Sequence, residues 1–237
     1  MENPSYTTLA RQTGLRNELR VIANNIANSA TTGYRQEGLM FSEYVRDLGD
    51  GESLSMAAAR VQLTSSQQGA LSETGGSFDL AIEGEGFFLV ETPNGPRLTR
   101  AGAFSPNAQG DLVTMDGYRV LDAGAAPLFV PPASTDVQIA SDGTISTQGR
   151  AIGQIAIVQP TEQMRTERED GVFFRADDGW DPVVEPRVLQ GYLEQSNVDV
   201  LGQMARMIEV QRGYELGQSF LESEHERVRT ALKSLTK

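Results

Sequence analysis

The sequence contains no cysteine and only one histidine, and both shortages narrow the chemistry that the chain can perform. Without cysteine, disulfides, thiolate nucleophiles and cysteine metal sites are excluded. His225 lies among acidic residues, but a hydrolase triad would need a serine in a Gly-x-Ser-x-Gly elbow, and no such motif occurs. We find no catalytic constellation and expect neither enzyme activity nor a cofactor. His225 is expected to make a buried or interfacial polar contact.

Long hydrophobic runs are also missing. No apolar segment approaches the ~18–20 residues that span a bilayer, so we expect no membrane insertion. The first residues, Met-Glu-Asn-Pro, lack the basic start and apolar core of a secretory signal peptide. Apolar residues make up 39% of the chain, and its 24 glycines and 10 prolines predict many turns.

Basic residues are too few to balance the acidic ones, and the net charge of −12 is concentrated in the middle of the chain. Residues 1–45 carry four acidic and four basic side chains, residues 188–237 carry seven and six, and residues 46–187 carry 21 and ten. Nearly neutral ends suit close packing, whereas an acidic middle suits a solvated surface. This balance argues against a nucleic acid partner.

Three short patterns resemble ligand-binding or catalytic motifs without completing one. Residues 84–86, Gly-Glu-Gly, lack the third glycine of a phosphate loop and precede two phenylalanines, which favours a tight turn before a strand. Residues 142–144, Asp-Gly-Thr, have no accompanying metal ligands, which favours a hairpin turn. An acidic group lacks the spacing of a calcium loop and is interpreted as a solvated face. Its members are Glu167, Glu169, Asp170, Asp177, Asp178 and Asp181.

The C-terminal segment predicts a long helix that packs in an assembly, because every seventh residue is apolar. This stripe consists of Val200, Met207, Tyr214, Leu221, Val228 and Leu235. A second seven-residue series, offset by four, is apolar at its ends and polar in its middle: Met204, Gln211, Gln218, His225 and Leu232. Its polar members are expected to set register between subunits or to face a narrow, partly wet channel.

Two further features of this segment concern the start of the helix and a glycine within it. Ser196, with Asp199 three residues later, predicts a capping box at the start of the helix. Gly213 disfavours a helix by ~1 kcal/mol relative to alanine. A close backbone approach by another helix would explain that glycine.

The N-terminal segment predicts a second amphipathic helix, with Leu15, Leu19, Ile22 and Ile26 at helical spacing. Asn3 can cap its start, Pro4 suits its first helical position, and Gly33 can take the left-handed conformation that follows its end. Near that end lie three weak helix formers, Asn24, Asn25 and Asn28. They either cap the helix locally or hydrogen-bond to neighbouring helices and set register.

The middle of the chain predicts short β-strands. Turns at residues 94–96, 116–117 and 142–143 each separate two β-rich runs, and residues 152–158 predict a further strand. This spacing indicates an antiparallel sheet or small barrel instead of a βαβ fold.

We therefore predict an α+β fold, with long N- and C-terminal helices packed as a coiled-coil-like pair and a central antiparallel β domain. Residues 1–45 and 188–237 form the helical assembly domain, residues 46–76 an extended connector and residues 77–187 a β-rich outer domain. A rival interpretation is an intramolecular coiled coil that supports a β domain binding a ligand or peptide. The predicted assembly interface comprises Leu15, Leu19, Ile22, Asn24, Asn25, Ile26, Asn28, Val200, Met204, Met207, Gln211, Tyr214, Leu221, Val228 and Leu235.

Four ordered motifs resemble the bacterial flagellar rod and hook proteins and span nearly the whole chain. The first is VIANNIAN at residues 21–28 with TTGYR at 31–35, and the second is QGALSETG at 68–75 with FDLAIEGEGFF at 78–88. The third is TRAGAFS at 99–105 with GDLV at 110–113 and GY at 117–118. The fourth is LEQSNV at 193–198 leading to MIEVQRGYE at 207–215.

The modest length and the run YELGQSFL at residues 214–221 resemble proximal-rod members, with distal-rod members as the alternative. Late in the last helix, His225-Glu226 stands where the family often has Asp-Glu. The resemblance implies a non-enzymatic subunit of the periplasmic rod, which passes torque from motor to hook. It implies terminal helices in an inner tubular core and a β-rich domain outside. It also implies, as partners, copies of this chain, other rod proteins and the flagellar type III export apparatus, with export that needs no cleaved signal peptide.

Overall fold

The computed structural model describes residues 3–47, 53–132, 134, 136–161 and 166–235, and side chains over 7–40, 63–132, 134, 136–161 and 167–234. The chain divides into two compact units. The helical unit comprises Met1–Ser29, Gln36–Ser65 and Val198–Lys237. The β unit comprises Ala30–Arg35 and Ser66–Asn197. The predicted α+β class is confirmed at this level, because helices at the two ends enclose antiparallel strands.

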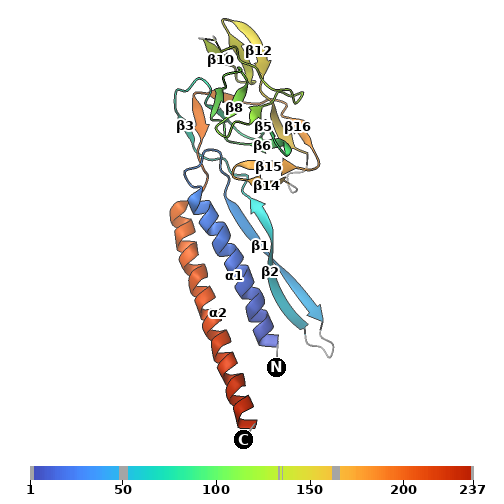
Figure 1. Ribbon diagram of the computed structural model, residues 1–237, viewed down its shortest axis with the longest axis vertical. Helices are drawn as coiled ribbons and strands as arrows, with labels where there is room; N and C mark the ends of the chain where they lie inside the picture. Colours follow the sequence, from blue (N-terminus) through green and yellow to red (C-terminus); the bar gives the residue numbers. More distant parts are fainter. Residues whose placement is uncertain (1–2, 48–52, 133, 135, 162–165, 236–237) are drawn as a thin grey trace. The chain divides into compact units, whose positions relative to one another are not determined.

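The helical unit consists of two helices and a hairpin (Figure 1). Helix α1 spans Asn3–Ala27 and helix α2 spans Val200–Leu235. Strand β1 (Glu37–Asp47) pairs antiparallel with β2 (Ser53–Thr64), and both strands pack against α1. A bulge breaks the register after Met40, which pairs with Val61, because Phe41 pairs with Ala59. The predicted caps of α1, Asn3 and Pro4, have side chains outside the described ones.

This hairpin corrects the expectation of a connector over residues 46–76, and it shows that the predicted domain boundaries are misplaced. Residues 36–65 belong to the helical unit, whereas residues 188–197 belong to the β unit. The sequence around β2 is rich in serine and alanine, so its apolar signal is weak. What makes it a strand is eleven residue pairs with β1, a long-range partner that satisfies its backbone groups.

The β unit is built from short antiparallel strands. Those of the main sheet are β5 (Phe87–Thr92), β6 (Gly95–Thr99), β7 (Phe104–Pro106), β8 (Leu112–Thr114), β9 (Arg119–Val120), β13 (Ile157–Pro160), β14 (Thr166–Asp170), β15 (Phe173–Ala176) and β16 (Trp180–Pro182). Their order is β14-β15-β6-β5-β9-β8-β7, and β13 pairs with both β5 and β16.

Three smaller sheets complete the described part of this unit. One has the order β10-β11-β12, and the others pair β17 with β4 and β18 with β3. These strands are β3 (Leu71–Glu73), β4 (Leu80–Ile82), β10 (Val137–Ile139), β11 (Thr144–Thr147), β12 (Arg150–Gln154), β17 (Val188–Gln190) and β18 (Tyr192–Glu194). The last two pairings bring residues 188–194 back to residues 71–82.

Strand β5 is buried on both faces. Phe88 and Val90 belong to the larger hydrophobic cluster, and Leu89 between them belongs to a second cluster with Leu98 and Phe174. Side chains alternate across a strand, so β5 supplies both clusters from one short apolar run.

The predicted turns are confirmed. β5 and β6 pair across residues 93–94, Gly117 (φ +84°) lies between β8 and β9, and Gly143 (φ +84°) lies between β10 and β11. The single strand expected over residues 152–158 is wrong. It is divided into β12 and β13, which belong to different sheets, because the chain leaves one sheet near Ile155 and enters the other.

Candidate assembly surface and a buried arginine–glutamate cluster

Polar contacts fix helices α1 and α2 as an antiparallel pair (Figure 1). Gln12 Nε2 donates to the Tyr214 carbonyl oxygen at 2.8 Å. Arg206 Nε donates to Glu18 Oε1 at 2.7 Å, and this bond raises the pKa of the guanidinium. Residues farther along α1 therefore pair with residues earlier in α2, as expected for antiparallel helices. The Arg206–Glu18 pair and the Gln12 amide help to set the register of the two helices.

The predicted seven-residue stripe of α2 faces α1 over the length of that helix. Val200, Met207, Tyr214 and Leu221 are half-buried, whereas Val228 is 51% exposed. The side chain of Leu235 lies outside the described ones.

The second series is offset by three residues instead of four. Val210 is 2% exposed, and the other members, Gln203, Gly217 and Glu224, are half-buried. The predicted members with an offset of four are all exposed in the single chain: Met204, Gln211, Gln218, His225 and Leu232. Both offsets flank the same stripe, and only the placement of α1 decides which flank is covered.

The apolar residues predicted for α1 lie toward its neighbours. Ile22 is buried, and Leu15, Leu19 and Ile26 are half-buried. Among the asparagines, Asn24 is exposed and Asn28 half-buried, and Asn28 Nδ2 donates to the Asn24 carbonyl oxygen at 2.9 Å. Asn24 and Asn28 therefore bond to each other at this end of the helix.

Asn25 has a different role from the other two asparagines. It is 1% exposed, and its amide bonds both backbone groups of Glu37: Nδ2 to the carbonyl oxygen at 2.8 Å and Oδ1 from the N–H at 3.0 Å. Nδ2 also donates to Gln203 Oε1 at 3.2 Å. Asn25 thus joins α1 to β1 and α2 within one chain.

The close backbone approach expected at Gly213 is wrong, and a close side-chain contact occurs one turn later instead. A Cβ on Gly213 would meet only Leu15 Cδ1 at 3.7 Å, an ordinary contact. A Cβ on Gly217 would lie 1.9 Å from Gln12 Nε2. The helix start also differs from the prediction: Asp199 Oδ1 accepts from the Leu201 N–H at 3.1 Å, so Asp199, not Ser196, caps α2.

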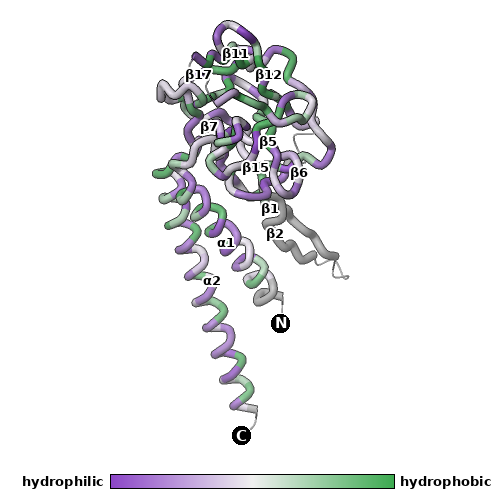
Figure 2. Tube along the Cα trace, turned by 45° about the horizontal axis from the view of Figure 1, so that its top comes forward, coloured by the Kyte–Doolittle hydropathy of each residue, from purple (hydrophilic) through white to green (hydrophobic). Residues whose placement is uncertain are grey.

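Helix α2 extends beyond the described part of α1 (Figures 1 and 2). Because Gln12 lies opposite Tyr214 and the helices are antiparallel, the start of α1 at Asn3 falls opposite the region of Ser223. Seven large apolar side chains on α2 are more than two-fifths exposed: Leu201, Met204, Ile208, Leu216, Phe220, Val228 and Leu232. So many exposed apolar groups on one helix are typical of a protein contact surface.

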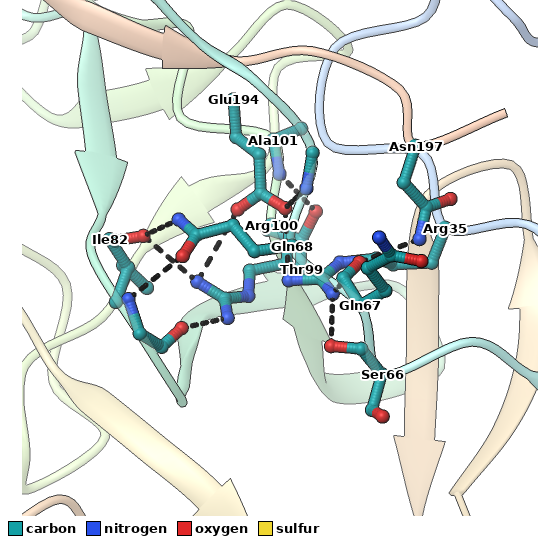
Figure 3. Close-up of polar contacts among 12 residues, drawn as sticks. Arg35, Ser66, Gln67, Gln68, Ile82, Thr99, Arg100, Ala101, Glu194 and Asn197 are labelled. Atoms are coloured by element: carbon teal, nitrogen blue, oxygen red, sulfur yellow. Dashed lines mark hydrogen bonds and ion pairs between the residues drawn. The ribbon is translucent and has the colours of Figure 1, made fainter. Parts of the chain in front are cut away.

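The β unit contains a buried ion cluster that the sequence analysis did not single out (Figure 3). Glu194, at the end of β18, is 1% exposed. Its Oε1 lies 2.9 Å from Arg35 Nη2, and its Oε2 lies 3.4 Å from Arg100 Nη1. Both arginines are 3% exposed. One carboxylate therefore serves two buried guanidinium groups.

Backbone carbonyls take up other guanidinium protons. Arg35 Nη1 donates to the oxygens of Ser66 and Gln67, and Arg100 donates to those of Ile82 and Gly84. Burial lowers the pKa of Arg100 to about 10, opposed by the charge of Glu194, and burial likewise lowers the pKa of Arg35. Removal of the carboxylate would leave two uncompensated buried charges.

Each side chain of this cluster comes from one of the resemblance motifs: TTGYR, TRAG or LEQSN. The signal available in the sequence was a charged residue within each motif. What the sequence did not give was that residues 35, 100 and 194 meet.

The acidic group of residues 167–181 is an exposed, partly paired surface. Arg175 lies 2.8 Å from both Glu167 and Asp177, and Arg97 pairs with Glu169. Among the described residues, no group of histidine and acidic side chains is arranged to hold a metal ion. Neither described helix has a stretch apolar enough to cross a membrane.

Three family models match separate segments of the chain. Residues 6–35 match the family described as "Flagella basal body rod protein", residues 81–147 match "Flagellar hook protein FlgE/F/G D1 domain" and residues 189–234 match "Flagellar basal body rod FlgEFG protein C-terminal". The matched segments include all three charged members of the cluster.

Three curated relatives illustrate the similarity. The flagellar basal-body rod protein FlgF of Caulobacter vibrioides is 34% identical, covering 100% of this chain and 99% of its own. FlgF of Mesorhizobium japonicum is 34% identical, covering 91% and 90%. The flagellar basal-body rod protein FlgG of Agrobacterium fabrum is 32% identical, covering 92% and 93%.

Proposed function

The chain belongs to the flagellar basal-body rod protein family, and from this premise we propose that it is a structural subunit of the proximal rod. It is not an enzyme, and its place is the flagellar basal body, where it assembles with other rod and hook proteins and transmits torque between motor and hook. The observation that carries this conclusion is the 34% identity to a FlgF protein over the full length of both chains.

We further propose that the terminal helices form the assembly interface and the inner core, as a coiled-coil-like pair, with the β unit outside. Support comes from the apolar side chains that α2 leaves exposed, above all Val228 and Leu232 beyond the described start of α1. Apolar area buried by a neighbouring subunit would contribute about 25 cal/mol per Å². Of the predicted interface residues, Ile22 and Asn25 are buried in the single chain's own packing.

Export through the flagellar type III apparatus is part of the same proposal. It rests on membership of the rod protein family. The location would be the periplasmic rod.

An experiment on the exposed end of α2 tests the assembly surface. The double variant Val228→Asp/Leu232→Asp changes side chains that are 51% and 60% exposed, so the chain should fold normally. We expect it to be lost from purified basal bodies and to abolish motility. Thr230→Asp, an exposed neighbour outside the seven-residue stripe, is the control and should incorporate. Normal rods built from the double variant would contradict the proposed interface.

Imaging of basal bodies with this chain labelled tests the position along the rod. A label at the motor end supports the proximal rod. A label adjoining the hook would instead favour a distal-rod subunit, the second candidate, because FlgG proteins also match most of the chain.

A further inference from the structure

The chain enters the β unit for six residues, Ala30–Arg35, between two segments of the helical unit. The last three of these residues, Gly33, Tyr34 and Arg35, are all buried, and we refer to them as the plug. The Gly33 N–H donates to the Glu194 carbonyl oxygen at 2.7 Å. Gly33 has φ of +70°, and a Cβ there would lie 2.3 Å from Ala101 N, so only glycine fits.

Arg168 covers the plug from β14. Its guanidinium lies 4.3 Å from the ring centroid of Tyr34 and 4.7 Å from that of Phe174. The same group donates hydrogen bonds to the carbonyl oxygens of Arg35 and Gly171. Tyr34, at 1% exposed, is therefore held by a cation–π contact on a buried ring as well as by packing.

The plug also binds the other two places where the chain passes between units, after Ser65 and after Asn197. Arg35 donates to the Ser66 and Gln67 carbonyl oxygens. Asn197 Nδ2 donates to the same Gln67 carbonyl oxygen at 2.6 Å, and the Asn197 N–H donates to the Tyr34 carbonyl oxygen at 3.3 Å. The β-unit residues at every place where the chain passes between the units thus belong to one hydrogen-bonded network.

Glu194 is the shared member of this network. Its carboxylate faces Arg35 and Arg100 and accepts from the Gly69 N–H at 3.1 Å, while its carbonyl oxygen accepts from Gly33. Buried networks of this kind are coupled, because each bond lies in a low dielectric and an unpaired member is unfavourable.

We propose that the plug and the Arg35–Glu194–Arg100 cluster form a lock that makes segments 30–35, 66–69 and 193–197 open and close as one unit, separately from the sheet core. Glu194 is its positioning residue. In a subunit that transmits torque, every covalent path into the β unit passes through these three segments. If the lock opens only as a whole, no single segment can unfold locally while the other two stay folded.

Hydrogen exchange of the full-length chain, resolved by segment, tests the lock. Glu194→Gln keeps the shape but removes the shared negative charge. We expect exchange in all three segments to accelerate together, by about 100-fold or more. Strands β5 and β6 should change less than about threefold. The matched control is Glu83→Gln in the exposed pair with Arg187, 3.0 Å apart, which should leave the three segments unchanged.

A second variant keeps the test decisive if Glu194→Gln fails to fold. Arg100→Met leaves Arg35 and Glu194 as a neutral pair, so the three segments should again accelerate together but at least tenfold less than expected for Glu194→Gln. The double variant Glu194→Gln/Arg100→Met should exchange more slowly than Glu194→Gln alone, a rescue that a purely steric role would not produce. Acceleration of segment 193–197 alone, or equal acceleration of β5 and β6, would overturn the lock.

Discussion

At the scale of single residues, neighbouring side chains of the same type can have different roles, depending on which of them is buried and hydrogen-bonded. Asn24, Asn25 and Asn28 occupy one turn, yet only Asn25 is buried, and it bonds both backbone groups of Glu37. An amide can replace a missing backbone partner in this way because it carries both a donor and an acceptor. Asn25 therefore acts within the chain as the register device that sequence reasoning expected between chains.

Replacement of Asn25 by leucine should destabilise the helical unit by about 2–4 kcal/mol, because the Glu37 N–H and C=O lose their buried partner. Urea unfolding followed by far-UV circular dichroism measures this loss. Asn24→Leu, on the exposed side of the same turn, is the control and should cost at most about 1 kcal/mol, because it removes only the exposed hydrogen bond from Asn28 Nδ2 to Asn24 Oδ1. Equal effects of the two variants would contradict the role assigned to Asn25.

The hydrogen bonds of the Asp142 carboxyl predict how its contribution to stability depends on pH. The Thr144 N–H and then the Thr144 hydroxyl, both at 2.9 Å, lower the pKa of its carboxyl below the ordinary 3.8. For an acid whose folded-state pKa is lowered, the stabilisation is present above the unfolded-state value and is lost as pH falls through the folded value. Thr144→Ala should raise the pKa by removing the hydroxyl bond, as measured by NMR titration of the carboxyl carbon. An unchanged pKa would show that this bond is unimportant.

At the scale of elements, the seven-residue pattern of helix α2 predicts the buried stripe correctly but not which flank of the stripe is buried as well. Its seven-residue stripe faces α1, but the second buried series runs through Val210 and Gly217, not through Met204 and Gln211. Helical periodicity fixes which residues share a face, whereas the partner fixes which flank of that face is covered. The apolar residues beyond the described start of α1 are exposed in the single chain.

The two glycines in the middle of α2 should respond differently to alanine. Gly213→Ala should stabilise the helical unit by about 0.5–1 kcal/mol, because alanine favours the helix and its Cβ meets only an ordinary contact. Gly217→Ala gains the same propensity but displaces the Gln12 amide from the Tyr214 oxygen, a loss of about 1 kcal/mol. Chemical denaturation compares them, and a larger gain from Gly217→Ala would contradict the assignment of the close approach.

At the scale of the whole molecule, the two units differ in the core that their described side chains form. Among the described side chains, the buried apolar residues of the helical unit are Ile22 and Val210, whereas the β unit has two hydrophobic clusters. Since burial of apolar area is the main stabilising contribution, the single chain should hold its helical unit less firmly than its β unit. Neighbouring subunits in a rod would supply the missing burial.

This difference predicts two unfolding transitions in the isolated chain. The only tryptophan, Trp180, lies in β16 and packs against the second cluster of the β unit, so its fluorescence reports on that unit alone. Helical circular dichroism at 222 nm should be lost at a lower urea concentration than the fluorescence signal. Coincident transitions would indicate that the two units unfold as one.

The sequence by itself determined the local features and the family: two terminal helices, the turns at residues 94, 117 and 143, and four motifs in order. These follow from short-range periodicity, glycine conformation and residue identity, which a linear chain carries directly. The tertiary structure decided which flank of α2 is buried, that residues 37–64 form a hairpin, and that Arg35, Arg100 and Glu194 share one site. Those features depend on partners distant in sequence, because pairing of strands and neutralisation of buried charge are satisfied only when the chain is folded.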